Sequence, residues 1–185
     1  MAVELSALDA ETDHLDVRLL ARVADGVDTP YGWLSDDAVP AGLLPIVLGR
    51  WKSWRFYLDL AATPDVFTVT GSPAAARRQA LGIARQLLAA GVTVTVVGAV
   101  LGPDVPPGCR RVDEFPPPEG FGPGSRPEVI VTEPLRGKAL TAARGLTART
   151  ASRVVPVLVG DVLRARWSVL ATAEADRPDR PTPAR

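Results

Sequence analysis

The sequence predicts an α/β protein: a Rossmann-like three-layer sandwich, in which a mostly parallel sheet carries an antiparallel N-terminal extension. The main observation is a strand–helix–strand pattern that occurs twice, over residues 66–97 and over residues 128–159. Two strands joined in this way should be parallel, with a right-handed crossover. A length of 185 residues with 46% hydrophobic and 23% charged side chains is typical of a globular protein. We therefore expect a single α/β domain over residues 15–172.

The residues before the first strand–helix–strand unit predict the antiparallel extension. Residues 1–14 are expected to form an N-terminal arm or a short helix. Apolar and polar side chains then alternate over residues 15–23, which favours a strand, although two consecutive leucines also permit a short helix. Residues 43–48 and 55–60 predict the two strands of a hairpin joined by residues 49–54. One face of the second strand is apolar and consists of Trp54, Phe56, Leu58 and Leu60.

The first strand–helix–strand unit contains signals for both ends of its helix. Ser72 can cap the N-terminus with its hydroxyl, and Pro73 fits the first helical position because no N–H partner is needed there. Gly91 is a favourable C-terminal cap, so the helix is expected to reach about residue 90. Its predicted buried face consists of Ala76, Ala80, Ile83, Ala84, Leu87 and Leu88. Its other face carries Arg77, Arg78, Arg85 and Gln86.

A Pro-rich loop over residues 102–127 is predicted to separate the two units. The second unit has a strand at 128–132, a helix over about 137–152 and a strand at 154–159. Its helix is expected to bury Leu140, Ala143 and Leu146 and to expose Lys138, Arg144 and Arg149. A last strand is predicted over residues 166–171, and a disordered tail over residues 173–185.

Composition excludes several classes of function. The 21 basic and 21 acidic side chains balance, which argues against nucleic-acid binding. The single cysteine, Cys109, and the single histidine, His14, exclude a disulfide framework and make a structural zinc site very unfavourable. No stretch of 18 apolar residues occurs and the N-terminus lacks the basic start of a signal peptide, so we expect a soluble chain. No cofactor is expected.

The turn at residues 71–78 is the predicted anion-binding site. A strand that ends in Gly71 and a helix that begins after Ser72 would offer free N–H groups, with Arg77 and Arg78 close by. The turn lacks the glycine, lysine and hydroxyl residue of the pattern G-x-x-x-x-G-K-[ST], so ATP hydrolysis is not expected. The alternative is that Ser72 and Pro73 only cap the helix, and this alternative is favoured.

Other candidate catalytic groups have weaker support. Glu133 and Asp161 follow predicted strands and could pair as acid and base, but their spacing does not indicate it. Asp113 and Glu114 lie beside the Pro-rich stretch without a metal-ligand pattern. His14 is the only candidate base for a catalytic triad, and Cys109 is expected to be an inert thiol. We expect no catalytic residues.

Aromatic residues in predicted turns and loops are the candidate partner contacts. Tyr31 and Trp33 lie in a predicted loop, and Trp51 lies beside Lys52 at the predicted hairpin tip. Aromatic and basic side chains together are typical of contact hot spots. The alternative is that these rings fold back over the edge of the sheet. A second candidate contact surface is the acidic part of the chain, since residues 1–70 carry five basic and eleven acidic side chains.

Three segments resemble the soluble domain of EccE, a membrane-associated component of actinobacterial type VII (ESX) secretion systems. They are LGRWKSWRFYLDLAATPDVFTVTGSPAAARRQALGIARQLLAAGVTVTVVG, GCRRVDEFPP and RVVPVLVGDVLRARWSV. The resemblance extends over roughly residues 43–172. EccE proteins carry hydrophobic transmembrane segments before this domain, and this sequence has none.

The resemblance implies a non-catalytic structural subunit that packs against other subunits of the type VII secretion membrane complex at the cytoplasmic side of the membrane. The order of segments also resembles the start of an FtsK/EccC-type ATPase domain whose phosphate loop is lost. An alternative of a different class is a small enzyme that binds a nucleotide or sugar nucleotide at Gly71, Ser72, Arg77 and Arg78.

Overall fold

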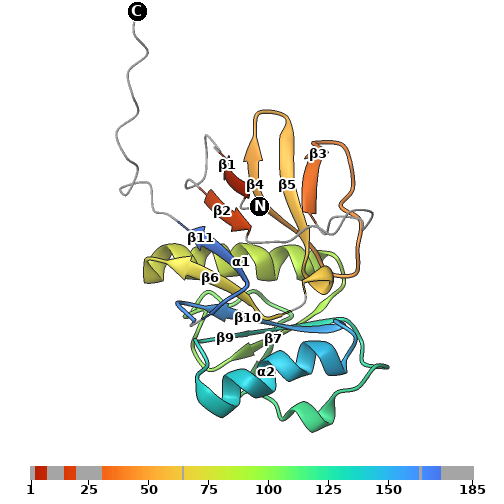
Figure 1. Cartoon of the computed structure of the whole chain (residues 1–185), viewed down its shortest axis with the longest axis vertical. Coiled ribbons are helices and arrows are strands. Elements are labelled where there is room, and N and C mark those ends of the chain that lie inside the picture. Colours follow the sequence, from red (N-terminus) through yellow and green to blue (C-terminus); the bar gives the residue numbers. More distant parts are fainter. Residues whose placement is uncertain (1–2, 8–14, 20–30, 64, 163, 172–185) are drawn as a thin grey trace, which may run out of the picture.

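A computed structural model describes residues 3–7, 15–19, 31–63, 65–162 and 164–171. It contains one large sheet with two helices and a second, smaller sheet (Figure 1). The large sheet has the order β1-β2-β11-β6-β10-β9-β7-β8. Its strands are β1 (Val3–Ala7), β2 (Leu15–Leu19), β6 (Phe67–Gly71), β7 (Thr93–Val97), β8 (Arg110–Val112), β9 (Glu128–Thr132), β10 (Val154–Val159) and β11 (Trp167–Ala171).

The predicted α/β fold with a mostly parallel sheet is confirmed. Six strands, from β11 to β8, are parallel to one another, while β1 and β2 form the antiparallel extension next to β11. Helix α1 (Pro73–Ala89) connects β6 to β7, and helix α2 (Gly137–Arg149) connects β9 to β10. The two crossovers run in opposite directions along the sheet, so α1 and α2 lie on opposite faces (Figure 1).

The prediction of an arm or a short helix over residues 1–14 is wrong for residues 3–7, which form strand β1. Val3–Ala7 pairs with β2 in an antiparallel register from Val3 opposite Leu19 to Ala7 opposite Leu15. Apolar side chains alternate with Glu4 and Ser6 in this segment, which is the period of a strand. Residues 8–14, with His14, lie outside the described residues.

The second sheet is the main feature that the sequence did not predict. Strands β3 (Tyr31–Ser35), β4 (Pro45–Trp51) and β5 (Trp54–Asp59) form an antiparallel sheet of their own in the order β3-β5-β4. The hairpin of β4 and β5 is therefore not part of the large sheet. The residues around Tyr31 form a strand rather than the predicted loop, because Tyr31 and Trp33 alternate with Gly32 and Leu34 and pair with β5.

The small sheet packs on the same face of the large sheet as α1 (Figure 1). The Gln86 side chain of α1 makes two hydrogen bonds to one residue of β4: the Val47 N–H donates to Oε1 (2.6 Å), and Nε2 donates to the Val47 carbonyl (2.9 Å). The Gln86 amide thus makes the two hydrogen bonds that a further strand would make with Val47 at this edge of the small sheet. The small sheet and α1 share one core with the large sheet, and Phe56, Ile83 and Val94 contribute to this core.

The connection between the two strand–helix–strand units is more ordered than predicted. Within the predicted loop over residues 102–127, β8 adds an edge strand parallel to β7, and η2 (Pro118–Gly120) forms a single 3-10 turn. Phe115 and Phe121 from this connection pack against the core on the α2 side of the sheet. A second 3-10 turn, η1 (Leu60–Ala62), connects the small sheet to β6 and is capped by Asp59.

Candidate functional site

The turn between β6 and α1 has the predicted local structure. The Ser72 hydroxyl accepts a hydrogen bond from the Ala75 N–H (3.4 Å), and Pro73 is the first helical residue. Gly71 has a φ of +116°, and a Cβ at this position would lie 2.0 Å from the Ala171 carbonyl oxygen. The end of β11 therefore packs directly on Gly71, and a side chain there is excluded.

The two arginines predicted to complete an anion site follow this turn in α1. The Arg77 Nε donates to the Val100 carbonyl (3.4 Å), and the Arg77 side chain lies beside Gly102 in the connection after β7. Arg78 is exposed on the next position of the helix. Gly71 and Ser72 thus form the predicted turn, whereas the Arg77 side chain lies along the connection after β7. Anion binding at this turn stays a prediction.

The end of the neighbouring strand, β10, is also packed too closely to leave room for a side chain. Gly160, directly after β10, has a φ of +128° and donates from its N–H to the Val69 carbonyl (2.8 Å). A Cβ at Gly160 would lie 2.6 Å from the ring of Pro134, which follows β9. Ligands of open α/β sheets bind outside the carboxyl ends of the strands. Here backbone and proline contacts fill part of that edge, and Glu133 and Asp161 are exposed beside it.

Two of the four predicted partner contacts pack toward the core. The Tyr31 ring lies 6.0 Å from Phe56 and 6.4 Å from Trp167, centroid to centroid. The Trp33 ring lies 5.3 Å from Phe56 in an edge-on arrangement. The Tyr31 ring thus links the small sheet to β11, and both rings fold back over the sheet as in the alternative given above.

The other two predicted contacts lie at the tip of the β4–β5 hairpin. Trp51 is the last residue of β4 and pairs with Trp54 in the backbone register, so the turn consists of Lys52 and Ser53 alone. Lys52 is exposed and has a φ of +55°, a conformation that glycine adopts more easily. The predicted turn over residues 49–54 is therefore too long.

Trp54 is the exposed aromatic residue that the sequence reasoning did not select. Its side chain is 45% exposed, although it lies on the same face of β5 as the buried Phe56 and Leu58. The alternation correctly placed Trp54 on the core-facing side. It could not show that the hairpin continues past the core, so that this ring is left partly uncovered.

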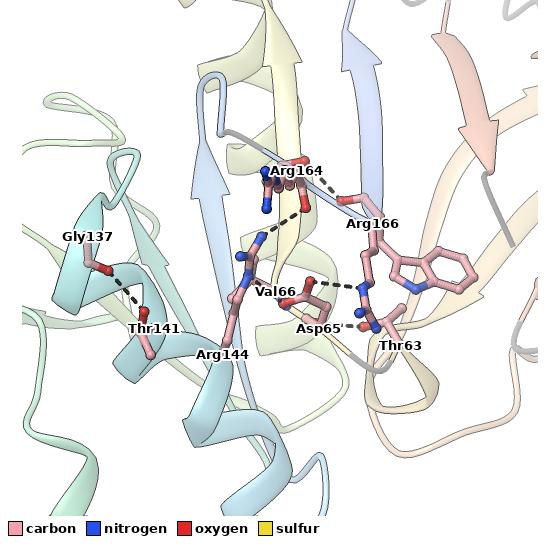
Figure 2. A network of polar contacts seen from close by, with 10 residues as sticks. Thr63, Asp65, Val66, Gly137, Thr141, Arg144, Arg164 and Arg166 are labelled. Carbon is pink, nitrogen blue, oxygen red and sulfur yellow. Dashed lines mark hydrogen bonds and ion pairs between the residues drawn. The ribbon is translucent and has the colours of Figure 1, made fainter.

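The amino-terminal edge of the large sheet holds a buried carboxylate, Asp65, directly before β6 (Figure 2). Its Oδ1 accepts from the Val66 N–H (2.8 Å) and from the Arg144 Nε (3.1 Å). Arg144 also donates to the Arg164 carbonyl (2.9 Å), and the Arg166 Nε lies 4.0 Å from Asp65 Oδ2. The predicted solvent-exposed role of Arg144 is therefore wrong, because α2 turns this residue toward β6 and the connection before β11.

A second polar cluster connects the middle of β7 with the first residues of β8 and β9. The Thr95 hydroxyl donates to Glu128 Oε1 (2.6 Å), and Arg110 donates both to that oxygen (2.8 Å) and to the Thr95 hydroxyl (2.9 Å). The Glu128 carboxylate is buried and carries a charge-assisted partner, as a buried charge requires. Both clusters satisfy their own groups and connect elements of the fold.

The remaining reactive groups singled out in the sequence, Cys109, Asp113 and Glu114, lie in the connection between the two strand–helix–strand units. Burial raises the pKa of the Cys109 thiol, although the nearby Arg111 opposes this effect. A raised thiol pKa lowers the thiolate fraction, which agrees with an inert cysteine. Asp113 and Glu114 are exposed, and the part of the chain that the structure describes contains no group of three His, Cys, Asp or Glu side chains that could hold a metal ion.

Comparison with known proteins gave no match to a family model, a curated protein or a solved structure. Among the described residues, neither helix combines the length and the apolar character that crossing a bilayer requires.

Proposed function

We propose that this chain is a non-catalytic interaction subunit, and that it belongs to a type VII secretion membrane complex in the manner of the EccE soluble domain. Its partners would then be other subunits of that complex at the cytoplasmic side of the membrane. The observation that carries the non-catalytic part is the packing at the carboxyl edge of the large sheet, where Ala171 covers Gly71 and Pro134 covers Gly160. The resemblance of residues 43–172 supports the assignment to the secretion complex.

The contact proposed for this function is the tip of the β4–β5 hairpin. Trp54 is 45% exposed and Lys52 stands beside it in a left-handed conformation. A large ring at the end of an ordered hairpin can enter a pocket of a partner with little loss of side-chain entropy. Unfavourable backbone conformations in non-glycine residues are often retained where a contact depends on them.

The first test measures binding to the complex. The protein is mixed with detergent-solubilised type VII membrane complex, and the bound fraction is determined for the original chain, for Trp54→Ala and for Leu170→Ala. Leu170 is a matched control, because it is also partly exposed but lies on the large sheet. We expect Trp54→Ala to lower the affinity at least tenfold, as for an interface hot spot, and Leu170→Ala to leave it unchanged. Equal binding of both variants, or no binding at all, contradicts the proposal.

A second test addresses the alternative enzyme. A ligand that binds the native state raises its stability by about 2.7 kcal/mol at a concentration of 100 times the dissociation constant. Melting temperatures measured with ATP, GTP, NAD and UDP-sugars, each with and without magnesium, should not change. A rise with one nucleotide that is lost in Arg77→Ala and Arg78→Ala would overturn the non-catalytic assignment.

A further inference from the structure

We propose that residues 115–118, Phe-Pro-Pro-Pro, bind an aromatic-lined groove with a basic rim on a partner protein. These residues, called the proline segment below, lie between β8 and η2 in the connection that joins the two strand–helix–strand units. The inference goes beyond the proposed function, because this surface does not include Trp54 and the argument does not depend on which assembly the chain joins.

The chemistry of proline gives the proline segment a polyproline II conformation. The ring holds φ near −65° in each of the three successive prolines. Phe115, Pro116 and Pro117 each precede a proline, which excludes the helical region and leaves them extended values of ψ. Pro117 has a φ of −63° and a ψ of 132°, close to ideal polyproline II values. This conformation exists before a partner binds, so binding costs little conformational entropy.

Two phenylalanines hold the ends of this region against the protein. Phe115 packs against two groups of core residues on the α2 side of the large sheet, and Phe121 packs against one of them. The Phe121 N–H donates to the Pro118 carbonyl (3.2 Å) and closes the turn after the proline segment. Figure 1 shows this turn, η2, beside α2 and far from the β4–β5 hairpin. The fold thus presents the prolines to a partner on a fixed support.

The proline segment is accessible where a groove would contact it. Pro117 is exposed, and the other two prolines are partly exposed. Among the described residues, no group donates a hydrogen bond to the carbonyls of the first two residues of the segment. Other prolines of the same connection serve the fold instead, since Pro106 is buried and the Pro127 carbonyl accepts from the Thr93 N–H (3.4 Å). The proline segment therefore offers both apolar rings and hydrogen-bond acceptors to a partner.

Three carboxylates beside the proline segment indicate the charge of the partner. Asp113, Glu114 and Glu119 are exposed, and their side chains form no ion pair or hydrogen bond within the described part of the chain. The base nearest in sequence, Arg111, belongs to β8 and lies close to Cys109 instead. Negative charges on both sides of an apolar segment are the electrostatic complement of a groove whose rim carries lysine or arginine.

This combination favours a protein groove over other partners. Aromatic-lined grooves of several protein modules recognise Pro-rich segments in the polyproline II conformation. The phosphates of a nucleic acid or of an anionic membrane would be repelled by the three carboxylates. A basic protein without such a groove would contact the carboxylates and leave the prolines without partners.

The first test measures binding to SH3, WW and EVH1 domains, three modules with aromatic-lined grooves, which are immobilised separately for surface plasmon resonance. The intact protein is applied as the original chain, as Pro117→Ala and as Pro123→Ala. Pro123 is the matched control, because it is exposed in the same connection but lies in a turn. We expect at least one module to bind the original chain. Pro117→Ala should weaken that binding about tenfold, and Pro123→Ala should leave it unchanged. Circular dichroism spectra establish that the variants are folded.

A second pair of variants tests the charges. Glu114→Gln/Glu119→Gln removes two carboxylates beside the proline segment. Glu133→Gln/Asp161→Asn removes two exposed carboxylates at the carboxyl edge of the large sheet. We expect the first variant to bind the same module about threefold more weakly, as for two exposed charge pairs, and the second to bind like the original chain. A loss in Glu114→Gln/Glu119→Gln without a loss in Pro117→Ala would mean that charge alone is recognised, and would overturn the inference.

A synthetic peptide of residues 112–120 gives the last comparison. The peptide should bind the module more weakly than the intact protein, because its Phe115 has no core to pack against and its chain must be ordered on binding. Tighter binding of the peptide would show that the fold hides the proline segment. That result, the absence of binding by all three modules, or equal binding of Pro117→Ala and the original chain overturns the inference. None of these outcomes depends on Trp54, so the proposed function is tested separately.

Discussion

The two sheets of this protein are held in place by different kinds of contact. In the large sheet, parallel strands pair through their backbones, and close approaches such as that of Gly71 to Ala171 leave no room for a side chain. The small sheet is attached through side chains, among them Gln86 to Val47 and the ring of Tyr31 to Trp167. The large sheet should therefore tolerate steric change poorly. Removal of any one of the side-chain contacts that attach the small sheet should lower the stability of the protein by a smaller amount.

The largest effect is expected for Gly71→Ala. The new Cβ would lie 2.0 Å from a backbone oxygen, and the φ of +116° is unfavourable for alanine. Steric overlap and backbone strain together should lower the free energy of unfolding by about 3–5 kcal/mol. Urea denaturation measures the loss. Gly82→Ala is the control, because Gly82 is helical with nothing within 4 Å of its Cβ position, and it should gain up to about 1 kcal/mol. Similar free energies of unfolding for the two variants would show that the close approach of β11 to Gly71 does not determine the stability of the protein.

The next effect concerns Asp65, which joins the end of the small-sheet connection to α2. Asp65→Asn removes the charge beside Arg144, whose side chain is 33% exposed, so the loss should be below that of a fully buried pair, at about 2 kcal/mol. The same denaturation experiment with Asp36→Asn serves as control. The Asp36 pair with Arg50 is short but solvent-exposed, and its removal should cost less than about 1 kcal/mol. A larger loss in Asp36→Asn would reverse this ranking.

A smaller effect is expected for Gln86→Ala, which removes both hydrogen bonds to Val47. Two neutral hydrogen bonds should contribute about 1–3 kcal/mol, and part of this is recovered because water can reach the edge of β4. Gln86→Glu keeps an acceptor for the Val47 N–H but loses the donor, so its stability should be intermediate. Hydrogen exchange of the Val47 amide gives a local measure of the same contact. Exchange that is equally slow in all three proteins would mean that Gln86 does not hold the small sheet.

The smallest of the four effects is expected for Lys52→Gly at the hairpin tip, and this change should be stabilising. Glycine relieves the backbone strain at the left-handed φ of +55° but also gives the unfolded chain more conformational entropy. The strain energy relieved should exceed the free-energy cost of that entropy by about 0.5 kcal/mol. The readout is the melting temperature. Lys52→Asn is the control, since asparagine tolerates this conformation and adds less entropy to the unfolded state. A lower melting temperature in both variants would show that the Lys52 side chain contributes more to the folded protein than the strain costs.

The sequence predicted the large sheet because its signals are local. Helix α1 begins at Pro73 after the Ser72 cap and ends within one residue of the expected position. The two strands of the second strand–helix–strand unit have the predicted bounds, 128–132 and 154–159. Apolar runs, caps and glycines act over a few residues, so they can be recognised without knowledge of the partner strand.

The candidate site was predicted less completely. Gly71 and Ser72 form the expected turn, but the direction of Arg77 depends on the Val100 carbonyl, which is 23 residues away. The Asp, Gly and Pro residues around Tyr31 and Trp33 predict a loop, and only the pairing with β5 shows that this segment forms a strand. The exposure of Trp54 follows from the length of the hairpin relative to the core, which is not encoded in the alternation itself.

The sequence by itself determined the α/β class, the two crossover helices and the antiparallel pairing of residues 43–60, because hydrophobic periodicity and capping are properties of short segments. The tertiary structure alone decided that this hairpin joins β3 in a separate sheet and that Arg144 turns inward to Asp65. Each of these outcomes depends on contacts between residues far apart in the chain. Such contacts are selected by the burial of apolar surface and by the pairing of charges in the complete fold.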